Sequence, residues 1–92
     1  MPRVEFIERT IWNIEGFQVK IMQNGADVRG DKFIPVQYTA ERMSKNSFTV
    51  SEWKAKFQRQ FPGYDVVVLN ANGSVARGNV KLSTVRDTYL NN

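Results

Sequence analysis

The sequence contains no cysteine and no histidine, and the two absences exclude several kinds of chemistry. Without cysteine there are no disulfides, no thiolate nucleophiles and no Cys-ligated metals. Without histidine the chain lacks the commonest metal ligand and the one side chain whose ordinary pKa lies near neutrality. Serine and threonine nucleophiles therefore lack their usual base, and the glycines form no phosphate-binding motif between a strand and a helix. We expect a protein that is not an enzyme and uses neither a metal nor a cofactor.

Long apolar runs are missing as well. No stretch approaches the roughly 18–20 apolar residues that span a bilayer. Glu5 and Glu8 interrupt the N-terminal segment, which is unlike a signal peptide. We therefore expect a cytoplasmic protein. Its 92 residues are enough for one domain, residues 1–92, and no internal repeat is visible along them.

Positive charge is present in modest excess, with 13 Lys and Arg against 9 Asp and Glu and a formal net charge of +4. This balance fits contact with nucleic acid, a ribonucleoprotein or an acidic protein surface, and it also fits the need of a small protein to stay soluble. The apolar fraction of 41%, with six Phe, three Tyr and two Trp, supports a packed core. The aromatics fill that core or stack on bases, although no run matches the RNP1 pattern of sheet-based RNA binders.

The N-terminal half predicts strands joined by tight turns. Residues 4–14 are ambiguous, because they are rich in strand formers yet place apolar residues at helical spacing. We favour a strand there, since Glu15-Gly16 then serves as a turn. Residues 17–23 alternate apolar and polar side chains, which is typical of a half-buried strand. Asn24-Gly25 predicts a hairpin turn. The returning strand runs from Ala26 toward Tyr38, with a bulge at Gly30 as one option, and Pro35 limits it to an edge strand or a broken strand.

The clearest element is a helix that follows residue 48. Thr49 and Glu52 fit a capping box, in which each side chain satisfies a free backbone N–H of the first helical turn. Pro62-Gly63 ends the helix. Its apolar residues recur at helical spacing and share one face. They are Val50, Trp53, Phe57 and Phe61.

The C-terminal part predicts a second hairpin. Residues 65–70 form a buried strand, Asn72-Gly73 is the turn, and residues 74–82 return. Ser83 or Thr84 then caps a short C-terminal helix. The sequence therefore predicts an α+β fold, in which a small antiparallel sheet of about four to five strands is built from hairpins. One main helix packs on that sheet, beside the short C-terminal helix.

Basic residues concentrate between positions 42 and 59, and this stretch is the main candidate for a partner-binding surface. On the predicted helix, Lys56 and Arg59 lie opposite the apolar face and project outward three residues apart. Such a ridge contacts phosphates or an acidic protein groove, or it is the ordinary solvated face of a helix. The candidates in this stretch are Arg42, Lys45, Lys54, Lys56 and Arg59.

Further basic candidates lie near the two predicted hairpins, namely Arg29, Lys32, Arg77 and Lys81. In strict alternation Arg77 and Lys81 share one face of their strand, unless a bulge at Gly78 breaks the parity. If the helix covers the other face of the sheet, this face is polar and exposed. It contacts a partner, or it is an ordinary open sheet face.

Three blocks of the sequence carry a resemblance to a known group of proteins. They are Thr10–Phe17 (TIWNIEGF), Gln23–Gly30 (QNGADVRG) and Lys45–Tyr89, which includes FTVSEWK, FPGY and LSTVR. In these blocks, in length and in basic balance, the chain resembles the type I-F anti-CRISPR proteins encoded by bacteriophages. Anti-CRISPR proteins share no common signature, so the resemblance itself assigns no site residues.

The resemblance implies a stoichiometric inhibitor that docks on the Csy surveillance complex in the cytoplasm of a bacterial host. It would contact backbone Cas subunits, with the crRNA as a further partner, and stop target DNA from hybridising to the guide. A positive charge fits binding to guide-RNA phosphates and acidic Cas patches better than mimicry of DNA, which needs a strongly negative surface. The competing interpretation is a small basic nucleic-acid-binding regulatory protein of a phage or mobile element. Neither involves a membrane or a small-molecule substrate.

Overall fold

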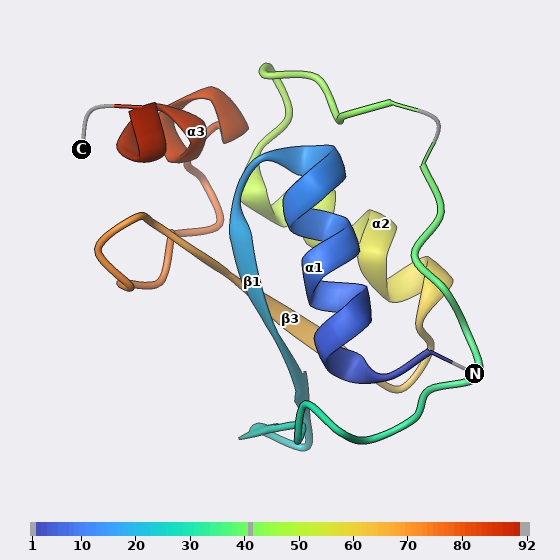
Figure 1. Ribbon diagram of the computed structural model, residues 1–92. Helices are drawn as coiled ribbons and strands as arrows, with labels where there is room; N and C mark the ends of the chain where they lie inside the picture. The colour runs from blue at the N-terminus through green and yellow to red at the C-terminus, as the bar shows by residue number, and fades with distance from the viewer. Residues whose placement is uncertain (1, 41, 91–92) are drawn as a thin grey trace.

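The computed structural model describes residues 2–40 and 42–90 of the chain (Figure 1). Within these residues, helices pack with a three-stranded antiparallel sheet of order β2-β1-β3. In chain order the elements are α1 (Val4–Glu15), β1 (Gln18–Gln23), β2 (Ala26–Asp27), α2 (Val50–Gln60), β3 (Asp65–Leu69) and α3 (Leu82–Leu90). The predicted α+β class is confirmed, but the expected four to five strands are more than the described residues form.

The first element is a helix, so the predicted strand over residues 4–14 is wrong. Val4, Ile7 and Ile11 are fully buried, because their spacing brings them to one helical face. Their burial outweighs the strand preference of β-branched residues, which depends strongly on context. The helix ends at Gly16, whose φ of 82° lies in the left-handed region that glycine adopts at little cost.

The first hairpin turn forms as predicted, but its second strand is short. Asn24-Gly25 has φ values of 55° and 79°, as a two-residue hairpin turn requires. The strand β2 ends at Asp27, so the predicted strand over residues 26–38 is wrong beyond that point. The backbone carbonyls of Gly30 and Lys32 instead accept hydrogen bonds from the first N–H groups of α1. This part of the chain therefore caps a helix and does not extend the sheet.

The predicted main helix is confirmed as α2. The N–H of Glu52 donates to Thr49 Oγ1 at 3.2 Å, and the N–H of Thr49 donates to Glu52 Oε1 at 3.0 Å. Both halves of the capping box are therefore present. Trp53 and Phe57 are fully buried on the apolar face, and Gly63 turns the chain toward β3 with a φ of 87°.

The second hairpin is also shorter than predicted. β3 pairs along β1, and after the Asn72-Gly73 turn Val75 forms a bridge to Leu69. The chain leaves the sheet edge after residue 76, so the predicted strand over residues 74–82 is wrong. The C-terminal helix exists but is longer than the expected last turn, because α3 extends over nine residues.

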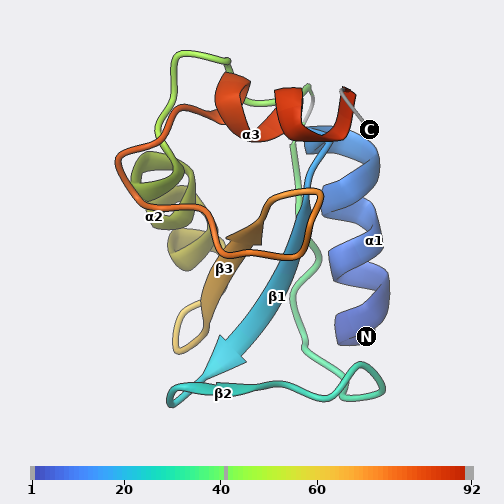
Figure 2. The same ribbon diagram turned by 90° about the vertical axis from the view of Figure 1, so that its left-hand side faces the viewer.

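Two segments of the chain share one architecture, although no repeat was expected. Residues 2–34 (unit 1) and 48–82 (unit 2) each contain a helix, a strand, an Asn-Gly turn and a segment that runs back to the start of the helix (Figure 2). The clearest sequence match follows the turns, where unit 1 reads NGADVRGDKFI and unit 2 reads NGSVARGNVKL. The structure thus contains an internal repeat, which the separate prediction of each helix and strand did not reveal.

The same backbone hydrogen bonds close both units, from the first N–H groups of the helix to the returning segment. Donor first, the pairs are Val4–Lys32 and Glu5–Gly30 at 2.8 and 2.9 Å in unit 1, and Val50–Val80 and Ser51–Gly78 at 2.8 and 2.9 Å in unit 2. Gly78 is therefore not the predicted bulge but a close-approach position, where an added Cβ would lie 2.2 Å from Ser51 Oγ.

One strand from each unit forms the centre of the sheet. β1 and β3 form the central antiparallel pair (Figure 2), and Lys20 and Val67 face each other at the middle of its register. The pairs on either side of this position have all of their side chains buried in the core. These pairs are Val19–Val68 and Ile21–Val66.

Aromatic packing, mostly from unit 2, fills much of the core. The rings of Phe17 and Trp53 meet edge to face with centroids 5.1 Å apart, and those of Phe57 and Phe61 stack at 4.5 Å. These four side chains are buried, so they are core residues and not stacking platforms for bases. Within the described residues, no helix has the length and apolar character needed to cross a membrane.

Candidate functional site

Four of the predicted basic residues line one hollow of about 590 Å³ on the surface of the protein. We call it the cationic groove, and its cations are Arg42, Lys45, Lys56 and Arg59. The other residues that line it are Thr39, Ala40, Met43, Ser44 and Phe48, so no acidic residue is among the described residues at this site. The groove therefore combines a positive rim with a partly apolar floor.

Two parts of the chain meet to form the groove. Lys56 and Arg59 come from α2, whereas Arg42 and Lys45 come from the segment between unit 1 and unit 2. Lys56 is half-buried, and its ammonium group donates to Ser44 Oγ at 3.3 Å. Lys56 is thus not the freely projecting side chain that helical spacing predicted, since it also ties the connecting segment to α2. Arg42, Lys45 and Arg59 are exposed.

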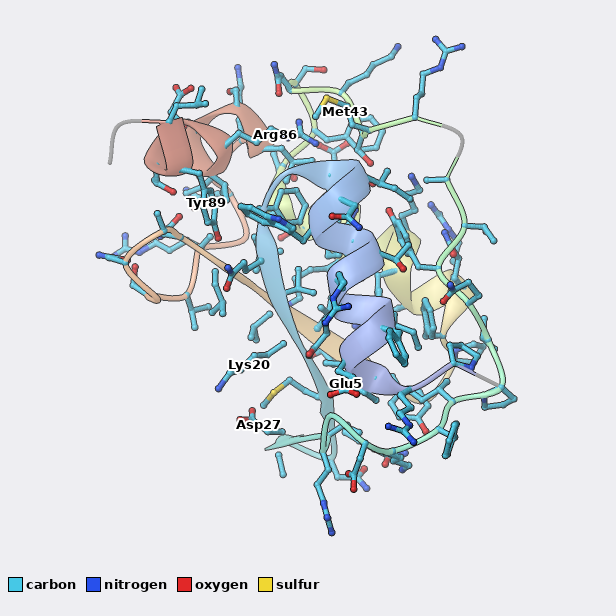
Figure 3. All side chains as sticks on the ribbon, viewed as in Figure 1. Glu5, Lys20, Asp27, Met43, Arg86 and Tyr89 are labelled. Carbon is cyan, nitrogen blue, oxygen red and sulfur yellow. The ribbon has the colours of Figure 1, made fainter. Side chains whose placement is uncertain are left out.

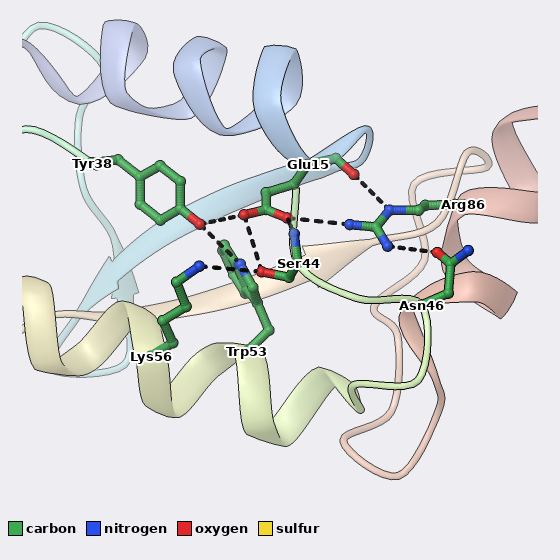
Figure 4. Close-up of polar contacts among 7 residues, drawn as sticks. All are labelled: Glu15, Tyr38, Ser44, Asn46, Trp53, Lys56 and Arg86. Atoms are coloured by element: carbon green, nitrogen blue, oxygen red, sulfur yellow. Dashed lines mark hydrogen bonds and ion pairs between the residues drawn. The ribbon is translucent and has the colours of Figure 1, made fainter. Parts of the chain in front are cut away.

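A buried carboxylate fixes this connecting segment from inside (Figure 4). Glu15 is fully buried at the end of α1. Its carboxylate accepts hydrogen bonds from the Ser44 N–H at 2.8 Å, from the Ser44 hydroxyl at 3.2 Å and from the Tyr38 hydroxyl. Desolvation, and next the hydrogen bond to Glu15, raise the pKa of Tyr38, so this hydroxyl stays protonated and keeps donating.

Arg86 on α3 completes the cluster. Its guanidinium donates to the Glu15 carbonyl at 2.7 Å and to the Glu15 carboxylate at 3.2 Å. A further N–H donates to Asn46 Oδ1 at 2.7 Å (Figure 4). Burial lowers the pKa of Arg86, but not enough to remove the charge of a guanidinium. The cluster therefore joins α1, the connecting segment and α3 at one point.

Sequence reasoning missed the residues of this cluster. The sequence predicts Glu15 in a turn, but the helix that replaces the predicted strand places it on the buried side of α1. The available signal was the apolar spacing of residues 4–14, whose continuation as a helix brings position 15 to the same face as Val4 and Ile11. Nothing local in the sequence pairs Glu15 with Arg86, 71 positions away.

The other predicted basic residues lie outside the groove. Lys54 approaches Asp65 at 3.9 Å. Arg29 forms an exposed ion pair with Asp31 at 3.2 Å, and Lys32 donates to Gln23 at 3.1 Å. The four residues of these two pairs line a separate hollow of about 440 Å³. Asp27 lines it too, so its two cations are balanced by two aspartates.

Arg77 and Lys81 are exposed on the loop between the second turn and α3. They are not on a strand, so the predicted sharing of a sheet face through alternation does not apply to them. Arg77 occupies the position in unit 2 that Arg29 occupies in unit 1, directly before the glycine whose carbonyl caps the helix. Both arginines therefore belong to the repeated frame.

No family model, no curated protein and no solved structure matches the chain. Across residues 2–40 and 42–90, no group of three or more acidic side chains lies close enough to hold a metal ion. The interpretation of the groove therefore depends on its own geometry and charge.

Proposed function

We propose that the protein is a stoichiometric inhibitor of a type I-F CRISPR-Cas surveillance complex. In the cytoplasm of a bacterial host it binds Cas subunits, with the crRNA as a further contact, and prevents target DNA from hybridising to the guide. The resemblance to phage anti-CRISPR proteins supplies the partner. The observation that carries the binding role is the cationic groove, because four cations gather there from two separate parts of the chain.

The chemistry of the groove favours an anionic macromolecular surface. Three of its cations, Arg42, Lys45 and Arg59, are exposed, so their charged groups are accessible to a partner. Exposed cations of this kind contribute mainly to the association rate and to specificity. An isolated exposed ion pair adds little binding energy, whereas several cations that contact one partner together add more. The anchored segment beneath them lowers the conformational entropy lost on binding.

The competing proposal is a small regulatory protein that binds free nucleic acid through the same cations. Phosphate contacts alone would give an affinity that falls steeply with salt, by roughly 10³-fold between 50 and 200 mM for about six contacts. The partly apolar floor of the groove, with Met43 and Phe48, favours a protein or nucleoprotein surface over bare phosphates. Measuring both partners over the same salt range separates the two functions.

The test is a binding measurement with the purified Csy complex and the variant Arg42→Glu/Arg59→Glu. We expect the affinity to fall by about 10- to 100-fold, and the complex to regain target DNA binding. The matched control is Arg29→Glu/Arg77→Glu, which makes the same change in net charge outside the groove and should leave binding nearly unchanged. Equal losses in both variants, or no association of the wild-type protein with the complex, would contradict the proposal.

A further inference from the structure

A second hollow of about 410 Å³ lies beside the cationic groove, where α1 ends and α3 packs against it. We call it the apolar hollow, and its lining residues are Trp12, Gly16, Met43, Arg86, Tyr89 and Leu90. Met43 also lines the cationic groove, so the two depressions share a wall. Figure 3 shows Met43, Arg86 and Tyr89 gathered at this end of the molecule.

The hollow presents apolar atoms to the outside. Trp12 is 39% exposed, Met43 48% and Leu90 78%. Among the described residues, Arg86 is the one charged residue that lines it, and its guanidinium already donates to Glu15 and to Asn46. A ligand of the hollow is therefore recognised by apolar contact and not by charge.

Comparison of the two units shows that the shared frame does not require an aromatic residue here. When Val4 is placed on Val50, Trp12 falls on Gln58, and the exposed Phe6 falls on Glu52. The helix of unit 2 thus keeps a polar outer face at the positions where unit 1 exposes two aromatics. Unit 1 therefore exposes apolar surface at positions where the repeated frame accepts polar residues.

We propose that the apolar hollow receives an apolar side chain of a protein subunit of the partner, whose neighbouring acidic residues meet the cationic groove. This inference rests on the proposed function and specifies the chemistry of the surface that is bound. Because Met43 lines both depressions, the apolar hollow and the cationic groove lie side by side. This arrangement is complementary to a partner surface on which an apolar side chain lies next to acidic residues. Large apolar anchors in pockets dominate the energy of many protein interfaces, and tryptophan is enriched among them.

An apolar side chain fits this site better than a nucleic-acid base. The Trp12 ring meets the Tyr89 ring at 63°, with centroids 5.2 Å apart, so the two rings form a corner and not a parallel slot for a base. Met43 and Leu90 add flexible aliphatic walls, which adapt to an aliphatic or aromatic side chain. Within the part of the chain that the structure describes, the hollow also offers a phosphate no free charged group, because Arg86 is already paired.

The test compares Trp12→Gln, which copies the residue of unit 2, with Leu90→Ser and the control Val75→Ser. Val75 is also apolar and 59% exposed, and it forms a bridge to Leu69 after the second turn and does not line the hollow. We expect Trp12→Gln to weaken binding to the Csy complex by about 10-fold or more, and Leu90→Ser by about 3-fold. The control should stay within about twofold of the wild type. Leu90 is so exposed that its substitution leaves folding intact, which thermal unfolding verifies.

The outcomes separate this inference from the proposed function. If the wild-type protein binds the complex while Trp12→Gln and Leu90→Ser bind equally well, the hollow is not part of the interface and the inference is overturned. If Trp12→Gln weakens binding to naked single-stranded RNA as much as binding to the complex, a base occupies the hollow. The proposal that a protein side chain occupies it is then wrong. No binding by the wild-type protein overturns the proposed function and this inference together.

Discussion

Unit 1 and unit 2 have the same backbone frame but fill it with different side chains. The buried positions of α1 carry Ile7 and Ile11, where α2 carries Trp53 and Phe57. A core between two related units needs complementary volumes, and small aliphatic residues opposite large aromatics supply them. The repeat therefore determines the arrangement of the elements, whereas the side chains of each unit are specialised.

The sharpest difference between the units lies at one buried position. Glu15 at the end of α1 falls on Phe61 at the end of α2, and both side chains are almost completely buried. Unit 2 gains ring stacking at this position, whereas unit 1 buries a carboxylate that holds the connecting segment and α3. The groove and the hollow both lie where the connecting segment or α3, which do not repeat, meet a helix of the repeated frame, and Glu15 anchors those non-repeating parts to that frame.

The largest expected effect comes from removing that carboxylate. Glu15→Ala leaves the buried guanidinium of Arg86 without its counter-charge and the Ser44 N–H without an acceptor. We expect the free energy of unfolding, measured with urea, to fall by about 3–5 kcal/mol.

The double variant Glu15→Phe/Arg86→Leu tests the comparison itself, because it gives unit 1 the type of residue that unit 2 has. Buried ion pairs are often replaced by apolar residues at little cost, so this variant should recover part of the stability lost in Glu15→Ala. Its groove should nevertheless bind less well, since the connecting segment loses its anchor. A double variant no more stable than Glu15→Ala would show that position 15 is not equivalent to position 61.

A smaller effect concerns the starts of the two helices. α2 has its capping box at Thr49, whereas the N-cap of α1 is Arg3, which makes no side-chain hydrogen bond to the helix. Thr49→Ala should cost about 1 kcal/mol, and Arg3→Ser should add up to about 0.5 kcal/mol, both measured by urea unfolding. A loss of stability in Arg3→Ser would show that its contact with the Phe33 ring, at 5.3 Å, outweighs a cap.

This difference in capping explains which parts of the fold could be predicted. The sequence identified α2, both Asn-Gly turns and the strands β1 and β3, because each has a local signal. It did not identify α1, whose first N–H groups are satisfied by the backbone of Gly30 and Lys32 and not by a nearby side chain. With a strand predicted over residues 4–14, the two units have different predicted elements, so the repeat is not visible at that level.

The candidate site was predictable in part for the same reason. The cluster of cations between positions 42 and 59 is a local feature, and four of its five members do line the groove. The exception is Lys54, which points toward Asp65 from a different side of α2. The anchor formed by Glu15 and Arg86 depends on a contact between distant positions, which no local pattern encodes.

The smallest expected effect concerns Glu8 on α1 and the residue at the equivalent position of α2. Glu8 on α1 falls on Lys54 of α2, and its carboxylate accepts a hydrogen bond from the Ile21 N–H at 3.0 Å. Burial raises the pKa of Glu8 above its ordinary value, although the Ile21 hydrogen bond opposes the shift. A raised pKa means that the folded state favours the protonated form. The stability linked to Glu8 is therefore full below the unfolded pKa, near 4.3, and declines as the pH rises through the folded pKa.

Glu8→Gln removes this titration while keeping an oxygen that accepts the Ile21 hydrogen bond. We expect the variant to match the wild type near pH 4 and to become slightly more stable than the wild type at pH 7, as followed by urea unfolding at a series of pH values. Lys54→Gln is the control from unit 2, since it loses only a weak contact at 3.9 Å and should show no comparable gain in stability between pH 4 and 7. A Glu8→Gln variant that is less stable than the wild type at pH 7 would contradict this. The hydrogen bond from the Ile21 N–H to the charged carboxylate would then stabilise the protein more than burial of that charge destabilises it.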